Sequence, residues 1–261
     1  MSVAAEGTSS HLVIIMAITT TTAVVGFASG YLLARRRAMN AAVPAPQRRR
    51  NFESVFSVVS YNILADGLYA AVGAHAESPH GGFNTYSTPA ERAWSRRFPL
   101  IMSELDSLSP DVICLQEVQQ EKHGSFKRAL AARGYTTTLS KAGASEHDLN
   151  LMVAVRNNCF NVVNSAVVRL SDEAANVEDL DEDFRKQIEG KEAELLLVLL
   201  EHRETNRRLV VATTHLFWDP AFSDVKCFQA SLVARGLVKW LRRWGHPANS
   251  SAPVVLAGGA S

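Results

Sequence analysis

Residues 110–119 read PDVICLQEVQ, and this stretch decides the fold class. Its apolar, partly β-branched run at 112–116 predicts a buried strand. Glu117 follows that strand directly, at the point where the carboxyl ends of strands in α/β sheets collect ligands. The alternative interpretation of Glu117 is an acid in the first turn of a helix. The stretch therefore predicts an α/β fold and marks one candidate site residue.

Two other segments repeat this pattern of a buried strand followed by one polar residue. Asn62 follows FSVVSY at 56–61, and His215 follows RLVVATT at 208–214. Each has an ordinary structural explanation, because Asn62 suits a turn after its strand and His215 suits a satisfied position at a sheet edge. Three such residues on one rim are what a ligand site requires. We therefore expect Asn62, Glu117 and His215 to converge.

Short strand-like runs alternate with amphipathic stretches from residue 52 onward, which is typical of a layered α/β architecture. One helix is expected over 89–108, since Thr88 and Pro89 form a cap-then-proline start. Another is expected over 222–243, where apolar residues recur at helical spacing. The expected strands are 55–60, 112–116, 135–139, 150–156, 162–169, 195–201, 208–214 and 253–257.

Composition and cysteine usage fit an ordinary globular protein of one domain with an appendage. The three cysteines, Cys114, Cys159 and Cys227, stand singly, with neither a CxxC pair nor a His at ligand spacing. We interpret them as reduced core thiols rather than as a disulfide framework or a zinc site.

Charge is divided unevenly along a chain whose net charge is only +1. Residues 1–50 hold six Arg and one Glu, whereas 51–261 hold 21 basic and 25 acidic residues. Residues 172–194 contain ten Asp or Glu against three basic residues. We expect 171–194 to be a solvated surface insertion, partly helical from Asp181 to Ala193. This charge balance does not resemble that of a protein that binds nucleic acid by charge alone through a broad basic face.

Residues 11–34 contain no Asp, Glu, Lys or Arg and are long enough to cross a bilayer as a helix. Arginines at 35–37 and 48–50 follow, whereas a cleaved signal peptide would carry its basic residues before the apolar run. By the positive-inside rule the rest of the chain faces the cytosol, at the endoplasmic reticulum or the mitochondrial outer membrane. We expect a tail at 1–10, a transmembrane helix at 11–34 and a basic cytosolic linker at 35–51.

The three strand-end residues lie within longer motifs. These read SYNILADGLYA at 60–70, PDVICLQEVQ at 110–119 and TTHLFWDPAFSDVKCFQA at 213–230. In this order and spacing they resemble the endonuclease/exonuclease/phosphatase superfamily. The third motif, with THL, WDP and SDVK in succession, is similar to the carbon-catabolite-repressor deadenylases and their Angel and nocturnin relatives. The resemblance implies a four-layer α/β sandwich over 52–261.

The resemblance also implies roles for the strand-end residues. Glu117 would be the carboxylate that holds a catalytic Mg²⁺, with Mn²⁺ as the alternative ion. Asn62 would sit beside it and donate to the scissile phosphate or to a metal-bound water. His215 would hydrogen-bond the phosphate and stabilise charge in the transition state. Asn62 and His215 are therefore the candidate catalytic residues.

The third motif implies a site for the terminal base of a substrate. Pro220, with Trp218 behind it, would form a wall against which that base packs, because stacking on a flat apolar surface does not require a long sequence. Asp219 and Asp224 are expected to fix this loop rather than to perform chemistry.

Two stretches depart from the family pattern. Residues 253–261 read PVVLAGGAS where the family reads PVVLAGDFNS, so the Asp and Asn of that motif have no counterpart here. Residues 147–156 read HDLNLMVAVR in place of a DGCAIFYR-like strand, which bears on substrate preference. We hypothesise that 52–261 is the N-terminal part of the domain, from a truncated gene model or a splice product.

Three functions stay open from these motifs. The first, for the intact protein, is Mg²⁺-assisted hydrolysis of phosphodiester bonds at an RNA 3′ end, with poly(A) as one substrate. The second is hydrolysis of a small phosphoester such as a nucleotide or dinucleotide. The third is an inactive, membrane-anchored scaffold, motivated by the departure at 253–261.

Overall fold

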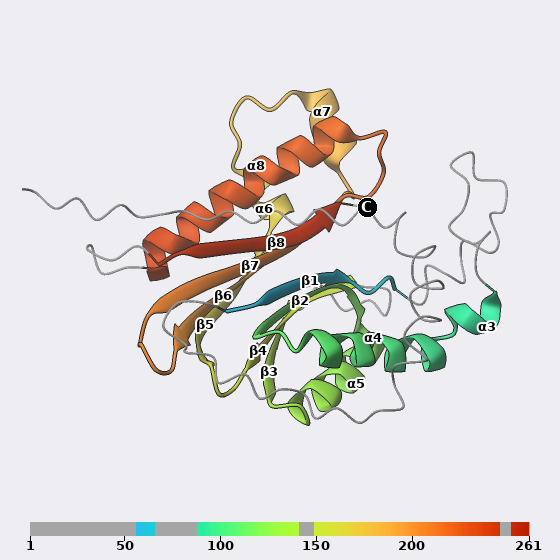
Figure 1. Cartoon of the computed structure of the whole chain (residues 1–261). Helices are drawn as coiled ribbons and strands as arrows, with labels where there is room; N and C mark the ends of the chain where they lie inside the picture. Colours follow the sequence, from blue (N-terminus) through green and yellow to red (C-terminus); the bar gives the residue numbers. More distant parts are fainter. Residues whose placement is uncertain (1–55, 66–87, 141–148, 246–251, 261) are drawn as a thin grey trace, which may run out of the picture.

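Figure 1 shows the computed structural model of the chain, which describes residues 56–65, 88–140, 149–245 and 252–260. The predicted tail, transmembrane helix and basic linker at 1–51 lie outside these residues. Among the helices of the described part, none is long and apolar enough to cross a bilayer.

The first sheet has the strand order β1-β2-β4-β3. β1 and β2 run parallel, whereas β4 lies antiparallel between β2 and β3. Parallel pairing brings the carboxyl ends of β1 and β2, with Asn62 and Glu117, to the same edge. The strands are β1 (Val58–Asn62), β2 (Val112–Gln119), β3 (Tyr135–Leu139) and β4 (Leu149–Arg156).

The second sheet has the order β5-β6-β7-β8, in which β8 alone pairs parallel, with β7. All of the predicted strands are present in the described residues, although β2 and β8 each run three residues further than predicted. The strands are β5 (Phe160–Arg169), β6 (Glu194–His202), β7 (Arg208–Leu216) and β8 (Val254–Ala260).

The two sheets pack face to face, and helices cover their outer faces (Figure 1). Cys114 of the first sheet and Val211 of the second belong to the core between the sheets. Successive residues of a strand point to opposite faces, so Ile113 packs outward with the helices of the first sheet and Leu197 with those of the second. The layers follow the order helix, sheet, sheet, helix, which confirms the predicted α/β sandwich.

The helix predicted over 89–108 is broken in two. α3 (Pro89–Arg92) is followed by Ala93, whose backbone is extended at φ −54° and ψ 132°, and then by α4 (Trp94–Leu108). After the break, the ring of Trp94 packs against Phe126 with centroids 5.9 Å apart. Packing of Trp94 against Phe126 therefore fixes where α4 starts, which helix propensity alone did not predict.

α5 (Gln120–Ala131) follows β2 and was not predicted. Only Phe126 and Leu130 of this helix are buried, and both are 0% exposed. Two buried apolar residues are too few to show a recurrence at helical spacing, and the helix also contains a glycine among polar residues. Packing onto the first sheet supplies the stability that the helix lacks by itself.

The acidic segment contains α6 (Leu170–Ala175) and α7 (Glu182–Ile188). Asp181 caps α7 by accepting from two backbone N–H groups, so the predicted helix start is confirmed, but the helix ends at Ile188 rather than at Ala193. Ala174 and Ala193, inside the predicted insertion, are each 7% exposed and belong to the core under α8. The expectation of a solvated surface insertion is therefore wrong for these two positions, which pack on the second sheet.

α8 (Ser223–Trp240) covers the second sheet and continues into η1 (Leu241–Gly245), a π-helical turn. It matches the helix predicted over 222–243. All three cysteines are free thiols; Cys114 and Cys159 are buried, whereas Cys227 on α8 is exposed. The interpretation as core thiols is confirmed for two of them and wrong for Cys227, which lies on the outer side of the helix.

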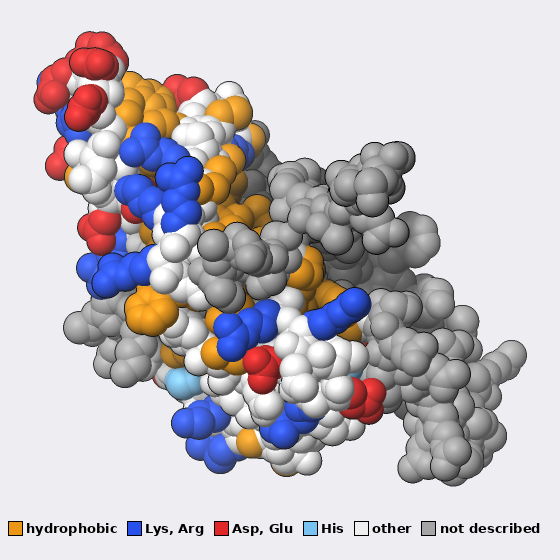
Figure 2. Space-filling model, turned by 90° about the vertical axis from the view of Figure 1, so that its left-hand side faces the viewer, with side chains coloured by type: hydrophobic (Ala, Val, Ile, Leu, Met, Phe, Trp, Pro, Cys, Tyr) orange, Lys and Arg blue, Asp and Glu red, His pale blue; other side chains and the backbone are white. Residues whose placement is uncertain are grey.

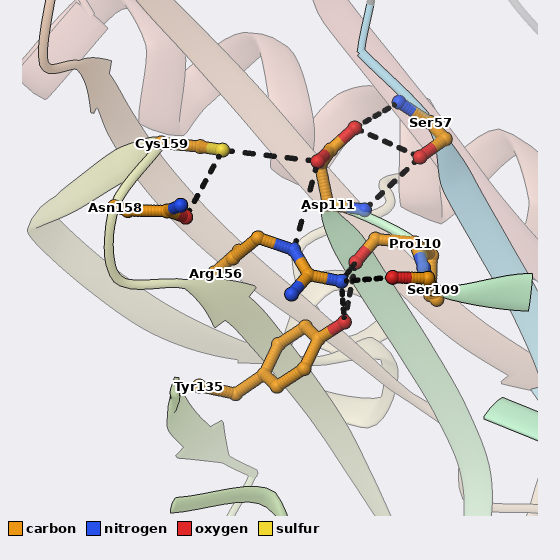
Figure 3. Close-up of polar contacts among 8 residues, drawn as sticks. All are labelled: Ser57, Ser109, Pro110, Asp111, Tyr135, Arg156, Asn158 and Cys159. Carbon is orange, nitrogen blue, oxygen red and sulfur yellow. Dashed lines mark hydrogen bonds and ion pairs between the residues drawn. The ribbon is translucent and has the colours of Figure 1, made fainter. Parts of the chain in front are cut away.

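A polar cluster closes the amino-terminal end of β2 (Figure 3). The Asp111 carboxylate accepts from the backbone N–H and the hydroxyl of Ser57, each over 2.8 Å. Arg156 at the end of β4 lies 3.7 Å from the same carboxylate and donates to the hydroxyls of Ser109 and Tyr135. The cluster holds the starts of β1 and β2 against the end of β4.

Candidate active site

The structure brings Asn62, Glu117 and His215 together at one rim of the sandwich. Asn62 Nδ2 donates to Oε1 of Glu117 over 2.6 Å, and His215 Nε2 lies 3.2 Å from the same oxygen. The backbone N–H of Ala65 donates to Oε2 over 2.8 Å. The side chains of Glu117 and His215 are 4% and 17% exposed. The three residues therefore meet as expected, and their chemical roles stay predictions.

A β-bulge sets the position of Glu117. The pairing of β2 with β4 shifts register between Leu115, opposite Met152, and Val118, opposite Asn150. Two residues of β2 thus face one residue of β4, and Glu117 takes a φ of 63°, in the left-handed region. This conformation is uncommon for a residue with a side chain, and such strain collects at functional sites.

The chain after β1 is shaped around the same carboxylate. Asn62 Oδ1 accepts the N–H of Leu64 over 2.8 Å, so one amide both closes a turn and contacts Glu117. Leu64 has a φ of 55°, and Arg97 of α4 donates to the carbonyl oxygens of Ile63 and Leu64. Arg97 is a positioning residue that sequence reasoning missed, because an arginine in an amphipathic helix carries no specific signal.

A buried amide supports the site from between the sheets. Gln116 is 2% exposed, and its Nε2 lies 3.0 Å from the hydroxyl of Thr213 in β7 and 3.2 Å from that of Ser60 in β1. These hydrogen bonds join the three strands whose ends form the site. A satisfied buried amide fixes their relative positions, since any shift would leave polar groups unpaired.

Glu117 is held in its ionised form. Burial of the carboxyl opposes ionisation, but hydrogen bonds from His215, from the Ala65 N–H and from Asn62 outweigh it and hold the pKa of Glu117 below its ordinary value. At neutral pH the rim therefore carries a buried negative charge. Such a charge favours a cation or a hydrogen-bond donor beside it.

The loop after β7 carries the residues expected to contact a base. Trp218 is 58% exposed, and Pro220 is exposed as well. Asp219 and Asp224 each accept a backbone N–H over 2.9 Å, as expected for residues that fix the loop. Within the described residues, no hydrogen bond or ring contact joins Trp218 or Pro220 to Glu117.

The chain is similar in sequence to exoribonuclease subunits. A CCR4-Not complex 3′-5′-exoribonuclease subunit Ccr4 from Phaeosphaeria nodorum is 26% identical over 203 residues, covering 74% of this chain. The Ccr4 subunit from Emericella nidulans is 29% identical over 194 residues, covering 70% of this chain. The chain is therefore similar in sequence to the Ccr4 exoribonuclease subunits. It spans 32% and 27% of the lengths of these two proteins, and no family model matches it.

Solved structures agree with this relationship. ANGEL2, a 2′,3′-cyclic phosphatase, superposes with a TM-score of 0.60 at 25% identity, over 78% of this chain and 52% of that chain. The catalytic domain of human nocturnin superposes with a TM-score of 0.55 at 21% identity, over 78% of this chain and 62% of that chain. The resemblance to the endonuclease/exonuclease/phosphatase superfamily and to its Ccr4, Angel and nocturnin branch is confirmed.

Two glycines of β8 lie beside the end of β7 that carries His215. In the pairing of β7 with β8, Gly258 lies opposite Thr214 and Gly259 opposite His215. A Cβ on Gly258 would stand 2.2 Å from the carbonyl oxygen of Thr214, whereas one on Gly259 would meet nothing within 4 Å. Gly259 stands where the family motif has its Asp, so among the described residues β8 supplies no carboxylate beside His215.

The residues present fit a hydrated divalent cation. Oε1 of Glu117 accepts hydrogen bonds from Asn62 and His215, and Oε2 accepts one from Ala65, so within the described residues one lone pair of Oε2 has no donor. Mg²⁺ accepts one carboxylate oxygen with water in its other positions. Within the described residues, no group of three or more His, Cys, Asp or Glu could hold a metal. Glu117 is therefore the candidate ligand.

Proposed function

We propose that this protein hydrolyses phosphodiester bonds at RNA 3′ ends with the help of a divalent cation, Mg²⁺ or Mn²⁺, at Glu117. The observation that carries the proposal is the buried Glu117 carboxylate, oriented by three donors at the rim where β1, β2 and β7 end. The exoribonuclease names of the Ccr4 subunits support RNA as the substrate class.

Each residue of the rim has a definite task in this proposal. Asn62 and the Ala65 N–H hold the Glu117 carboxylate in one orientation, which directs the remaining Oε2 lone pair. When bound, Mg²⁺ supplies positive charge that neutralises the phosphate and lowers the pKa of a coordinated water. His215 lies beside the carboxylate, and in this proposal its Nε2, now 3.2 Å from Glu117 Oε1, turns to donate to a phosphate oxygen as charge develops there.

The exposed loop after β7 supplies the substrate contact. Trp218 and Pro220 present apolar surface to solvent directly after the strand that carries His215. Stacking of a base on such a surface is tolerant of sequence, which suits an enzyme that removes terminal nucleotides one after another.

A conservative substitution of Glu117 tests the proposal. Glu117→Gln keeps the shape of the side chain but removes its charge, so we expect kcat/KM on a fluorescent adenylate oligomer to fall about 10²- to 10³-fold or more. The matched control is Glu121→Gln, since Glu121 is a 51% exposed acid in the first turn of α5. Hydrolysis should also stop with a chelator and return with Mg²⁺.

The thermal midpoint of each variant separates lost chemistry from lost folding. We expect Glu117→Gln to retain a cooperative transition. Full activity in Glu117→Gln, or in the presence of chelator, would remove the proposed role of the carboxylate.

A small phosphoester is the second candidate substrate, and the likeness to ANGEL2, a 2′,3′-cyclic phosphatase, favours it. A panel that compares an adenylate oligomer, an oligonucleotide ending in a 2′,3′-cyclic phosphate and a dinucleotide would rank these substrates by kcat/KM. The RNA 3′-end proposal requires the oligomer with a free 3′ end to be the best of the three.

An inactive scaffold is the third candidate, and Gly259 in place of the motif's Asp favours it. The same activity measurements distinguish a scaffold from an enzyme, because a scaffold binds Mg²⁺ weakly and shows no hydrolysis that depends on Glu117. A folded protein without any such activity on the panel would support this candidate over the other two.

We also propose that residues 11–34 anchor the protein in a membrane, with the domain in the cytosol. The support is a stretch of 24 residues without Asp, Glu, Lys or Arg followed at once by three arginines. The full chain should stay in the membrane pellet after alkaline extraction. A double Ile15→Asp, Val24→Asp variant should be released, and release of the unaltered chain would contradict the anchor.

A further inference from the structure

The end of the sandwich opposite the candidate active site presents a basic surface with one exposed tryptophan. Figure 2 looks onto this end and shows Lys and Arg side chains spread across it, with hydrophobic side chains among them. We call it the basal face. It consists of Arg203, Arg207 and Arg208 at the turn between β6 and β7, and of Arg242, Arg243 and Trp244 in η1.

The side chains of the basal face are exposed and have little acid to neutralise them. Trp244 is 52% exposed, and the Arg243 guanidinium lies 5.8 Å from the centroid of its ring. Glu201 accepts a hydrogen bond from Arg208 over 3.3 Å, and Glu204 is exposed in the same turn. Five arginines against these two acids leave the face positively charged.

The two halves of the basal face lie at the same end of the second sheet. The chain returns from η1 to Pro253, whose carbonyl oxygen accepts the N–H of Val210 over 2.9 Å. Val210 is two residues from Arg208, so the start of β8 and the turn between β6 and β7 border the same edge. Figure 1 shows the end of α8, the start of β8 and this turn on one side of the molecule.

The predicted anchor reaches the domain at this end. Phe56, the first described residue, packs its ring on Phe160 with centroids 5.8 Å apart, and Phe160 packs on His202 at 5.5 Å. His202 is the last residue of β6 and precedes the turn that carries Arg203 and Arg207. The 55 preceding residues, with arginines at 48–50, therefore join the domain beside the basal face.

We propose that the basal face docks on anionic phospholipid headgroups of the membrane in which residues 11–34 are anchored; this rests on the anchor proposed above. Arginines are attracted to the negative surface potential of a cytosolic leaflet, and tryptophan prefers the headgroup region, where its ring is buried and its N–H stays solvated. The anchor raises the local concentration of the basal face at the bilayer, so even a weak attraction to the headgroups is enough for docking.

Docking in this orientation keeps the candidate active site open. β7 runs from Arg208 in the basal face to His215 in the site, and seven residue steps of an extended strand span about 23 Å. The rim with Glu117 and His215 then faces away from the lipid. This separation also favours lipid over RNA as the occupant, because a substrate strand has to reach the rim at the far end.

Tryptophan quenching in liposomes tests the proposal on the full chain. All four tryptophans lie in the domain, at positions 94, 218, 240 and 244, so the anchor contributes no signal. The chain is reconstituted into brominated phosphatidylcholine, either alone or mixed with phosphatidylserine. We expect quenching only with phosphatidylserine, its loss in Trp244→Phe, and its persistence in Trp218→Phe, because Trp218 lies at the opposite end.

Charge reversals then identify the side chains involved. Arg203→Glu with Arg207→Glu, and Arg242→Glu with Arg243→Glu, should each remove most of the quenching. Lys127→Glu with Arg128→Glu, at exposed positions of α5, makes the same change in charge and should leave the quenching intact. Raised salt should weaken the quenching as well, because it screens exposed charges.

The outcomes separate this proposal from the anchor. If the chain does not float with liposomes of either composition, the anchor fails and the docking proposal falls with it. If it floats with both but phosphatidylserine causes no quenching of Trp244, the anchor stands and docking is overturned. Docking is also overturned if the charge reversals in the basal face leave the quenching unchanged. The same holds if these reversals weaken only the binding of an adenylate oligomer.

Discussion

The three cysteines occupy different environments, and this decides which thiol can react. Burial between the sheets raises the pKa of Cys114 to about 12, and Cys159 is buried as well, whereas Cys227 is exposed. We expect a maleimide to label Cys227 alone in the native protein and all three thiols after unfolding. Mass spectrometry of the labelled peptides checks this, and Cys227→Ser should abolish fast native labelling.

The pair of Asp106 and Arg133 makes a pH-dependent contribution to stability. Hydrogen bonds of 2.6 and 2.8 Å from Arg133 hold the pKa of Asp106 below its ordinary value. Because the folded pKa lies below the unfolded one, the pair stabilises the fold above the unfolded pKa, and this contribution is lost as pH falls through the folded pKa. The side chains of Arg133 and Asp106 are 36% and 50% exposed, so the contribution of the pair to stability should be below about 1 kcal/mol.

Arg133→Gln isolates this contribution. The variant should lower the free energy of unfolding at neutral pH, and the difference from the parent should vanish well below the pKa of an ordinary carboxyl. Urea titrations at both pH values measure it, with Arg128→Gln on α5 as the exposed control. If the difference in the free energy of unfolding stayed constant with pH, the effect of the substitution would not come from ionised Asp106.

At the scale of elements, the pairing of β7 with β8 depends on one glycine. A Cβ on Gly258 would stand 2.2 Å from the Thr214 carbonyl oxygen, which belongs to the neighbouring backbone and cannot give way. We expect Gly258→Ala to lower the free energy of unfolding by about 1–3 kcal/mol or more. Gly259→Ala is the matched control, because its Cβ meets nothing within 4 Å. Equal effects at both positions in chemical denaturation would contradict this explanation.

At the scale of the whole molecule, the hydrogen bond between Gln116 and Thr213 crosses between the two sheets beside the site. Gln116 Nε2 donates to Thr213 Oγ1 over 3.0 Å, where both residues are buried. Thr213→Val should cost about 1–3 kcal/mol, because it removes an acceptor from a buried amide. The double variant with Gln116→Leu should recover part of that loss, since it removes the buried amide whose acceptor on Thr213 is gone. Strict additivity in this double-mutant cycle would argue against coupling of the sheets through this bond.

The sheets of the whole molecule could largely be predicted from the sequence. The runs of β-branched and aliphatic residues marked each strand, because a strand between two packed layers must be apolar on both faces. The polar residues after three of these runs marked the rim, since the carboxyl ends of parallel strands meet there. α5 escaped prediction because Phe126 and Leu130 alone anchor it, and Cys227 was misplaced because α8 exposes one side.

By itself the sequence determined the α/β layers, the superfamily, and Asn62, Glu117 and His215 as residues of one rim. Only the tertiary structure decided how they meet: a bulge in β2 places Glu117 at a φ of 63°, and Arg97 holds the turn that presents the Ala65 N–H to its carboxylate. The physical reason is that periodicity records which side chains are buried along one strand. Bulges, backbone donors and the basal face arise from contacts between segments far apart in the chain, which leave no local pattern.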